Sequence, residues 1–451
     1  MVIETKTVDS LALAERAIEL ALATGATQAE AVVMRTDEAL TRFANSQIHQ
    51  NVSESNTALN LRFVEGKRIG VASTNRLDDE SLKRLAEQAA AIARLQPERV
   101  DFGGLPEPGP IPHVEGAWAR ETAEATPEVR AERARAVIAA ADDAGVTAYG
   151  SYKTTTEEVA VANSLGIRVS EERTLGHLIV VTMGADREAG YAEGAAVDHT
   201  TIDAAALGRE AAQKARSGRG AVAIDPGEYP VVLEAYAVVD LLDMLGYLGF
   251  SALAVQEDRS FFEPGKKIGT DLVTIRDDAP DPAGTPASFD YEGVGKQKVT
   301  LVDRGVCREL VYDAETAAKE GRRSTGHGLP APNTYGPFPL NQLLDAGSAS
   351  REDLIGELDR GLLVTRFHYT NPVHPKLAMV TGMTRDGVFL VEKGSIVGPV
   401  KNLRFTQSYL AALAGVEAVG AERRLLRGFL GSVVVPALRI SAFTFTGATE
   451  H

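Results

Sequence analysis

The sequence predicts an α+β fold with two domains: an N-terminal domain of mixed helices and antiparallel sheet, and a C-terminal domain that is mostly antiparallel β. Three observations support this prediction. The chain has 451 residues, which is long for one domain. Helical periodicity and strand alternation share the first half, whereas strands and turns dominate the second. A Ser-Gly-Arg-Gly stretch at 217–220 separates the two patterns, so we place the domains at residues 1–220 and 221–451.

The first domain is expected to alternate long helices with short strands. Apolar residues recur at helical spacing over residues 10–24. Asp78 and Thr126 are good N-cap residues for helices that run to about Leu95 and Gly145, and a further helix is expected over 202–216. Alternating residues predict strands at 30–35, 58–64, 68–73, 157–163, 166–171 and 178–183, and Glu65-Gly66-Lys67 predicts a hairpin turn between the second and third of them.

The second domain is expected to consist mostly of strands and turns. The apolar stretch 231–255 contains Glu234, Asp240 and Asp243, and three acids would be costly in lipid, so this stretch predicts a buried helix and no membrane span. Strands are predicted at 298–302, 309–312, 388–392, 395–400 and 438–445. Helices are predicted near 238–254, 351–359 and 406–416.

Composition excludes some classes of function. The formal charge of −15 argues against nucleic-acid binding, which needs a basic face. The first residues, Met1 to Lys6, show no basic region followed by an apolar core, so we expect a cytoplasmic protein with no membrane partner. Cys307 is the only cysteine, which excludes an intrachain disulfide and a cysteine zinc knuckle. No histidine is near it in sequence, so a buried structural thiol is expected.

The strong catalytic signatures are absent: there is no HExxH, no Gly-x-Ser-x-Gly and no phosphate-binding loop, and the lone Gly293-Val294-Gly295 is expected to form a turn. Of eight histidines, only His368 and His374 lie close together, and Pro372 between them rules out a regular helix. They could meet a distant carboxylate at a metal, but catalytic zinc takes three protein ligands, and polar loop histidines are the favoured interpretation. His327 lies in a Gly-flanked loop that suits either substrate contact or plain surface.

From about residue 226 onward the chain resembles the TldD/PmbA family of metallopeptidases. The resemblance is specific because many short strings follow in the same order and spacing, whereas the N-terminal half fits more loosely through Ile69–Ala72 and the helix after Asp79. The matching strings are Pro226–Leu233, Ala254–Ser260, Gly265–Gly269, Ile275–Asp278, Phe289–Val294, Ser324–Gly328, Gly361–Thr365 and Glu392–Val400.

The resemblance also indicates where a metal site would lie. In TldD-type members, a helix after the Val-Val-Leu strand carries His-Glu-x-x-x-His, which supplies zinc ligands and the catalytic Glu. Here these three positions fall on Asp243, Met244 and Leu248. Asp243 could ligate a metal, but Met244 cannot act as a base and Leu248 cannot ligate. The family's cysteine ligand lies late in the C-terminal domain, and Cys307 lies too far upstream to replace it.

The resemblance therefore implies the PmbA/TldE-like branch, with no catalytic residue and no metal in this chain and with zinc in a TldD-type partner. We expect a non-catalytic subunit of a heterodimer that acts on unfolded or extended peptides, which could add to a sheet edge. One alternative is a stand-alone metallopeptidase with a relocated site that draws on His368, His374 and Asp243. Another is a homodimeric peptide-binding protein without catalysis.

Overall fold

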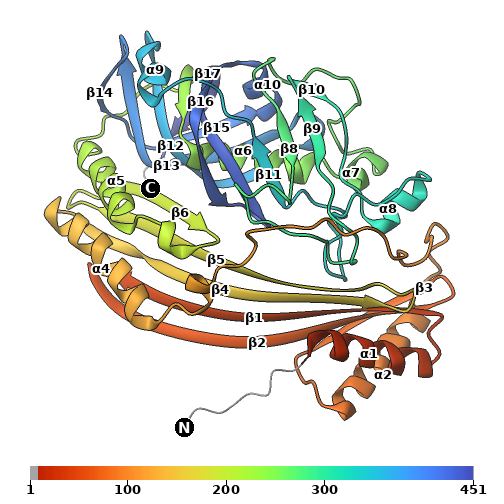
Figure 1. Cartoon of the computed structure of the whole chain (residues 1–451). Coiled ribbons are helices and arrows are strands. Elements are labelled where there is room, and N and C mark those ends of the chain that lie inside the picture. Colours follow the sequence, from red (N-terminus) through yellow and green to blue (C-terminus); the bar gives the residue numbers. More distant parts are fainter. Residues whose placement is uncertain (1–8, 450–451) are drawn as a thin grey trace.

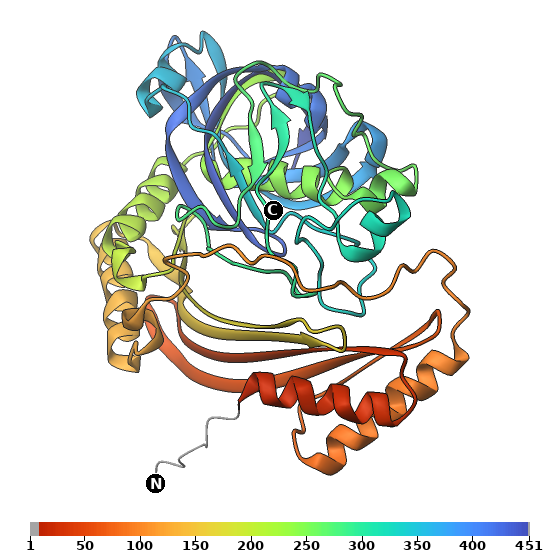
Figure 2. The ribbon, with the colours of Figure 1, turned by 45° about the vertical axis from the view of Figure 1, so that its right-hand side comes forward.

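The computed structural model describes residues 9–449 and confirms the α+β class. Figure 1 shows two layers: a long curved sheet from the N-terminal half and, above it, a compact β-rich body from the C-terminal half. Figure 2 shows the segment between the second and third helices, residues 96–119, running between the two layers. The two layers meet along one face of the N-terminal sheet.

The N-terminal sheet has six strands in the order β3-β2-β1-β4-β5-β6, and every neighbouring pair is antiparallel. Gly66 has a φ of +64° and makes the β2–β3 turn that the sequence predicted. Polar residues lie between apolar ones along the long strands, so one face packs on helices and the other faces the C-terminal domain. The strands are β1 (Gln28–Ala44), β2 (Gln47–Glu65), β3 (Arg68–Thr74), β4 (Thr147–Asn163), β5 (Arg168–Met183) and β6 (Ala189–Ala196).

Most helices of this half begin at side-chain caps, two of which the sequence predicted. The Asp78 carboxylate accepts the backbone N–H of Ser81, and the Thr126 hydroxyl accepts that of Val129. These bonds satisfy backbone donors that the first helical turn leaves free. The helices are α1 (Ser10–Ala23), α2 (Asp79–Leu95), α3 (Arg120–Ala123), α4 (Pro127–Asp143), the 3-10 turn η1 (His199–Thr201) and α5 (Ala204–Ser217).

The C-terminal half is built on an eleven-stranded, mostly antiparallel sheet, with only β7–β12 and β11–β17 paired in parallel. The strands are β7 (Gly227–Leu233), β8 (Ile275–Asp277), β9 (Val299–Asp303), β10 (Val306–Cys307), β11 (Asn341–Leu344), β12 (Arg360–His374), β13 (Met379–Glu392), β14 (Ser395–Pro399), β15 (Leu403–Ser408), β16 (Val416–Arg427) and β17 (Ser432–Ala448). The helices are α6 (Ala235–Leu248), α7 (Ala252–Gln256), α8 (Ala314–Lys319), α9 (Arg351–Gly356), η2 (Pro375–Leu377) and α10 (Tyr409–Ala414).

Helix α6 lies at the centre of this half, against β12 and β17. Most of its residues are buried, as the apolar stretch predicted, and they belong to the largest hydrophobic core. The described helices include none that is long and apolar enough to cross a membrane.

Several predicted elements differ in extent. The strands expected to be short at 30–35, 58–64 and 157–163 are parts of the long strands β1, β2 and β4. The strands predicted at 166–171 and 178–183 are one strand, β5, which begins at Arg168 and pairs with β4 over its whole length. The predicted helix 238–254 is broken at Gly249, whose Cβ position would lie 2.1 Å from the Phe261 ring. Residues 403–408 are strand, so α10 starts only at Tyr409. Residues 309–312 form only an isolated bridge, between Ser251 and Val311.

Candidate functional site

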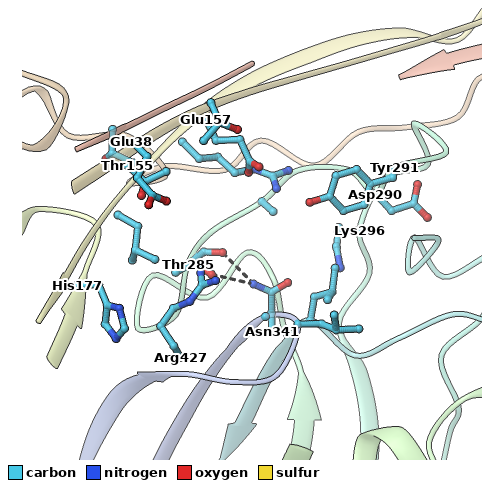
Figure 3. Close-up of a pocket in the computed structure, with 18 of the residues that line it drawn as sticks. Glu38, Thr155, Glu157, His177, Thr285, Asp290, Tyr291, Lys296, Asn341 and Arg427 are labelled. Atoms are coloured by element: carbon cyan, nitrogen blue, oxygen red, sulfur yellow. Dashed lines mark hydrogen bonds between the residues drawn. The ribbon is translucent and has the colours of Figure 1, made fainter. Parts of the chain in front are cut away.

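A pocket of about 310 Å³ lies between the N-terminal sheet and the C-terminal half (Figure 3). Strands β1, β4 and β5 supply one wall. Residues of three C-terminal segments, within 285–296, 340–341 and 427–431, supply the other. Polar and apolar groups line it together, which is typical of ligand pockets. It is the best-supported candidate site among the described residues.

Strand alternation explains the N-terminal wall. Side chains two residues apart point to the same face of a sheet, so Lys153 and Glu157 of β4 share a face, as do Arg173 and His177 of β5. The register places Lys153 opposite His177 and Glu157 opposite Arg173. Glu38 of β1 joins them and forms an ion pair with Lys153 at 2.9 Å. The wall is therefore a patch of alternating charges on one sheet face.

Lys296 is the most unusual group of the opposite wall. Its residue is 4% exposed, and its Nζ has no hydrogen-bond partner among the described residues. Figure 3 shows the side chain at one end of the pocket, near Tyr291 and Asp290. Burial lowers the pKa of Lys296, while the charges of Asp277 and Asp290 act to raise it. A buried amine without a partner is costly to a fold, so its presence calls for an explanation.

The carboxylates around Lys296 have their own partners. Asp277 accepts the backbone N–H of Asn341 at 2.8 Å and lies 2.9 Å from the Nε2 atom of His327. Burial lowers the pKa of His327, so we describe a neutral imidazole whose Nε2–H donates to Asp277. Asp290 accepts three backbone N–H groups, yet burial raises its pKa. None of these contacts uses the amine of Lys296.

A second polar group joins the two halves at the other end of the pocket. Glu193 of β6 lies 2.9 Å from the Nε2 atom of His177 and accepts the hydroxyl of Tyr191 at 2.7 Å. It also accepts the backbone N–H of Arg427 at 3.1 Å. Burial would raise the pKa of Glu193, but these hydrogen bonds outweigh it and lower the pKa. The Arg427 backbone is thereby fixed, while its exposed side chain has no ion pair among the described residues.

Helix α6 adjoins the pocket through Asp243. This carboxylate accepts the backbone N–H of Phe429 at 2.9 Å, in the segment that lines the pocket, and burial raises its pKa to about 7. One turn earlier, Asp240 accepts the hydroxyl of Tyr409, and burial raises its pKa to about 6. Both carboxyl groups serve the packing of α6 against its neighbours.

The chemistry of α6 does not fit a zinc ion. Asp243 is the one oxygen donor of the three positions, Met244 packs against the core, and Leu248 is 3% exposed. Within residues 9–449, no three His, Cys, Asp or Glu side chains lie close enough to hold a metal. Catalytic zinc needs three protein ligands and an open position, and these residues do not provide them.

The histidines noted in the sequence lie in different surroundings. His368 and His374 are on β12, opposite Met383 and Met379, and not in a loop. The strand continues through them because it pairs with β13 across two irregular steps. His327 is fully buried, so neither a surface position nor a contact in an open loop is correct. Cys307 is buried as expected, and burial raises its pKa to about 11.

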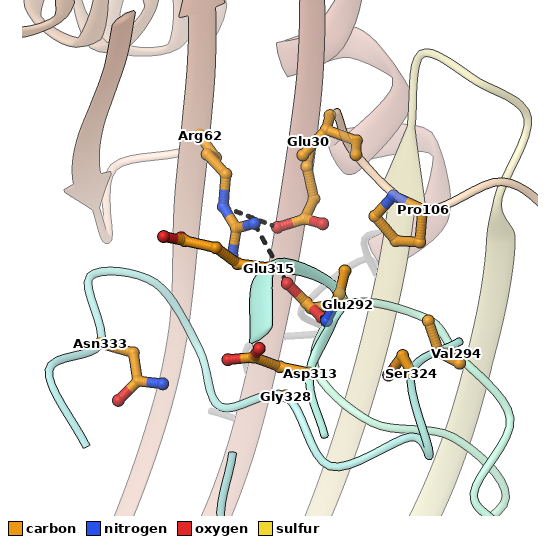
Figure 4. Close-up of polar contacts among 12 residues, drawn as sticks. Glu30, Arg62, Pro106, Glu292, Val294, Asp313, Glu315, Ser324, Gly328 and Asn333 are labelled. Carbon is orange, nitrogen blue, oxygen red and sulfur yellow. Dashed lines mark hydrogen bonds and ion pairs between the residues drawn. The ribbon is translucent and has the colours of Figure 1, made fainter. Parts of the chain in front are cut away.

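Arg62 connects the two halves outside the pocket (Figure 4). Its guanidinium lies 3.3 Å from Glu30 of the neighbouring strand and 3.2 Å from Glu292 of the C-terminal half. Glu292 also accepts the backbone N–H of Ala314 at 2.8 Å. Burial would lower the pKa of Arg62, but the two carboxylates outweigh it and raise the pKa. The pocket is thus bounded by halves that share a buried ionic cluster.

Sequence reasoning missed the pocket residues. A weak signal exists in β4 and β5, where ionisable residues stand at both ends of 153–157 and of 173–177, but this pattern indicates only a solvated strand face. Asp290 belongs to one of the family strings, yet no role follows from the string itself. For Lys296 the sequence offers no signal, because its burial depends on the N-terminal sheet.

Comparison with known proteins agrees with the fold. Models of three PmbA/TldA metallopeptidase domains match the chain: domain 1 at residues 29–93, the central domain at 120–219 and the C-terminal domain at 226–447. The division at residue 220 into two domains stays a prediction. The crystal structure of TldE from Thermococcus kodakarensis is similar in fold, with a TM-score of 0.88 at 23% identity over 96% of this chain and 100% of that one.

Curated relatives point the same way. A metalloprotease TldD homolog of Haemophilus influenzae is 27% identical over 86% of each chain. A metalloprotease of Methanothermobacter thermautotrophicus is 29% identical, and that match spans about half of each chain. Together with the three domain matches in order along the sequence, these relatives show that the chain belongs to the TldD/PmbA family of metallopeptidase homologues.

Proposed function

We propose that this chain is the non-catalytic, TldE-like subunit of a heteromeric zinc peptidase that acts on unfolded or extended peptides. The zinc and the catalytic Glu belong to a TldD-type partner, and this chain contributes the fold and a peptide-contacting surface. The lone, buried cysteine fits the reducing cytoplasm as the compartment.

The observation that carries the proposal is which residues occupy the motif positions of helix α6. The helix keeps its buried central position, but the three places that the family motif would use hold Asp243, Met244 and Leu248. Asp243 is already engaged by the Phe429 backbone, and Leu248 packs in the core. A helix that is kept for packing and has lost its ligands supports a structural role beside an active partner. Family membership alone would not establish activity.

Metal analysis and reconstitution test the proposal. The purified chain is expected to hold no stoichiometric zinc and to cleave no unfolded peptide. After mixing with a TldD-type homologue that carries His-Glu-x-x-x-His, the two are expected to co-elute as a heterodimer and to cleave a casein-derived peptide. Replacing the partner's motif Glu by Gln should abolish that cleavage, since the carboxylate activates the metal-bound water.

Two results would overturn the proposal. One is a tightly held zinc in the isolated chain. The other is chelator-sensitive cleavage by the isolated chain that disappears in the double variant His368→Ala, His374→Ala, which would favour the stand-alone peptidase. A chain that remains a homodimer in the presence of the partner would instead support the peptide-binding protein without catalysis.

A further inference from the structure

The interdomain pocket contains a buried cation that the protein itself leaves unused. Lys296 is 4% exposed, lines the pocket, and lacks a hydrogen-bond partner among the described residues. The nearby carboxylates of Asp277 and Asp290 accept backbone or imidazole N–H groups instead. Buried polar groups almost always have a hydrogen-bond partner, so a buried amine that lines a cavity without one indicates that a ligand supplies the partner.

The second observation is that charged groups without an ion pair among the described residues lie on both walls, because Lys153 and Arg173 of the N-terminal sheet already pair with Glu38 and Glu171. Arg427, an exposed arginine without an ion pair among the described residues, stands on the C-terminal side with Lys296. The N-terminal sheet presents Glu38 and Glu157. Glu157 has no ion pair within 4 Å among the described residues, although Arg173 faces it on the neighbouring strand. Figure 3 shows the two glutamates on the side opposite Arg427 and Asn341.

The geometry points to a binding site for a short peptide with free ends: its C-terminal carboxylate meets Lys296, and its N-terminal ammonium faces Glu38 and Glu157. The volume of about 310 Å³ suits a ligand of a few small residues, at the lower end of ligand pockets. Charge-assisted hydrogen bonds to a carboxylate are the strong ones, which favours this anchor. A phosphate would bring two charges towards Glu38 and Glu157 and fits less well.

This inference deepens the proposed function and rests on it for the peptide class. The site would retain short products or substrate ends beside the partner's active centre. The pocket adjoins α6 through the contact of Asp243 with Phe429. A bound peptide would therefore affect the helix that corresponds to the family's metal site.

Capped peptides test the anchor directly. Isothermal titration of the full chain would compare trialanine with its C-terminal amide and its N-acetyl form. Free trialanine is expected to bind, and amidation is expected to weaken binding by about tenfold or more, since it removes a charged acceptor from a buried donor. Acetylation is expected to weaken binding by about threefold to tenfold, because Glu38 is already shared with Lys153. Equal binding of the amide would overturn the inference, and equal binding of the acetylated form would overturn the assigned orientation.

Variants locate the site. Lys296→Met, which removes the amine but keeps most of the side chain's length, is expected to weaken trialanine binding by about tenfold or more. Lys298→Met is the matched control: this lysine is 53% exposed and pairs with Asp278, so binding should not change. Glu157→Gln changes a partly exposed side chain of the N-terminal wall and is expected to weaken binding of free trialanine, so it tests the site even if Lys296→Met is unstable. Unchanged binding in Glu157→Gln and Lys296→Met would overturn the inference.

The two hypotheses fail separately. If trialanine binds as expected but the chain never pairs with a TldD-type subunit, the pocket stands and the subunit role is wrong. If the reconstituted complex cleaves peptides but the affinity of the chain for trialanine does not depend on its free ends, the subunit role stands and the pocket assignment is wrong.

Discussion

Replacement of Arg62 by Met would remove the one cation that Glu30 and Glu292 share between the two halves of the protein. The two ion pairs are 3.3 and 3.2 Å long, and the side chains of both glutamates are at most 5% exposed. Removing one partner of a buried ion pair costs about 3–5 kcal/mol, because the other charge stays buried without compensation. We therefore expect Arg62→Met to lower the free energy of unfolding by about 3–5 kcal/mol at pH 9.

The loss should depend on pH in a defined direction. Burial raises the pKa of Glu292 from its ordinary value of 4.5 to about 8, although Arg62 acts to lower it. A carboxyl group with a raised pKa binds more protons in the folded state, so wild-type stability falls as the pH rises from about 4.5 to 8. Without Arg62 the pKa of Glu292 rises further. At pH 6 the group is then neutral in both proteins, and the loss should be less than half of that at pH 9.

Urea denaturation at pH 6 and pH 9 measures both quantities. The single tryptophan, Trp118, reports on the N-terminal half, and circular dichroism reports on the whole chain. The control is Arg68→Met, whose side chain is 44% exposed and lies 3.8 Å from Glu98, so it should change stability by less than about 0.5 kcal/mol. An equal loss at both pH values, or a loss no larger than that of Arg68→Met, would refute the reasoning.

Three further predictions concern other buried features. Burial raises the pKa of Asp243 from 3.8 to about 7, so the wild type loses stability as the pH rises through this range. In urea denaturation, Asp243→Asn should therefore be about 1–4 kcal/mol more stable than the wild type at pH 8, and its stability should differ little from the wild type at pH 4. His327→Phe removes a buried donor to Asp277 and should cost about 2–4 kcal/mol in the same assay. Gly70→Ala would place a Cβ 2.1 Å from a helix α2 carbonyl oxygen and should cost about 1–3 kcal/mol, whereas Gly398→Ala, which meets no atom within 4 Å, should change thermal stability little.

Each of these predictions can fail. An Asp243→Asn protein whose stability follows the same pH curve as the wild type would show that this carboxyl group titrates normally. A neutral His327→Phe change would mean that Asp277 finds another donor. Equal melting temperatures for Gly70→Ala and Gly398→Ala would contradict the close packing of α2 on β3.

The local features of the fold could be predicted well. The caps Asp78 and Thr126 and the turn at Gly66 were found from sequence because a cap or turn needs only its neighbouring residues. The break of the predicted helix at Gly249 was missed, since the chain there packs closely on Phe261, a residue twelve positions away, and such a contact leaves no local signal.

The candidate site could be predicted from the sequence less well than the local features of the fold. His368 and His374 attracted notice by their closeness in sequence, yet the structure places them on β12 without a third ligand among the described residues. The sequence pattern predicted β5 as two short strands. Polar residues that face the pocket, such as Arg173 and His177, interrupt the apolar alternation between them.

The sequence by itself determined the α+β class and the family resemblance, since these depend on residue identity and short-range order, whereas the replacement of the family's zinc motif by Asp243, Met244 and Leu248 stays a prediction. The tertiary structure alone decided that Lys296 is buried in a pocket and that Arg62 joins two halves. Both results arise where the N-terminal sheet meets the C-terminal domain, and contacts between residues about 230 positions apart leave no periodic mark on the chain.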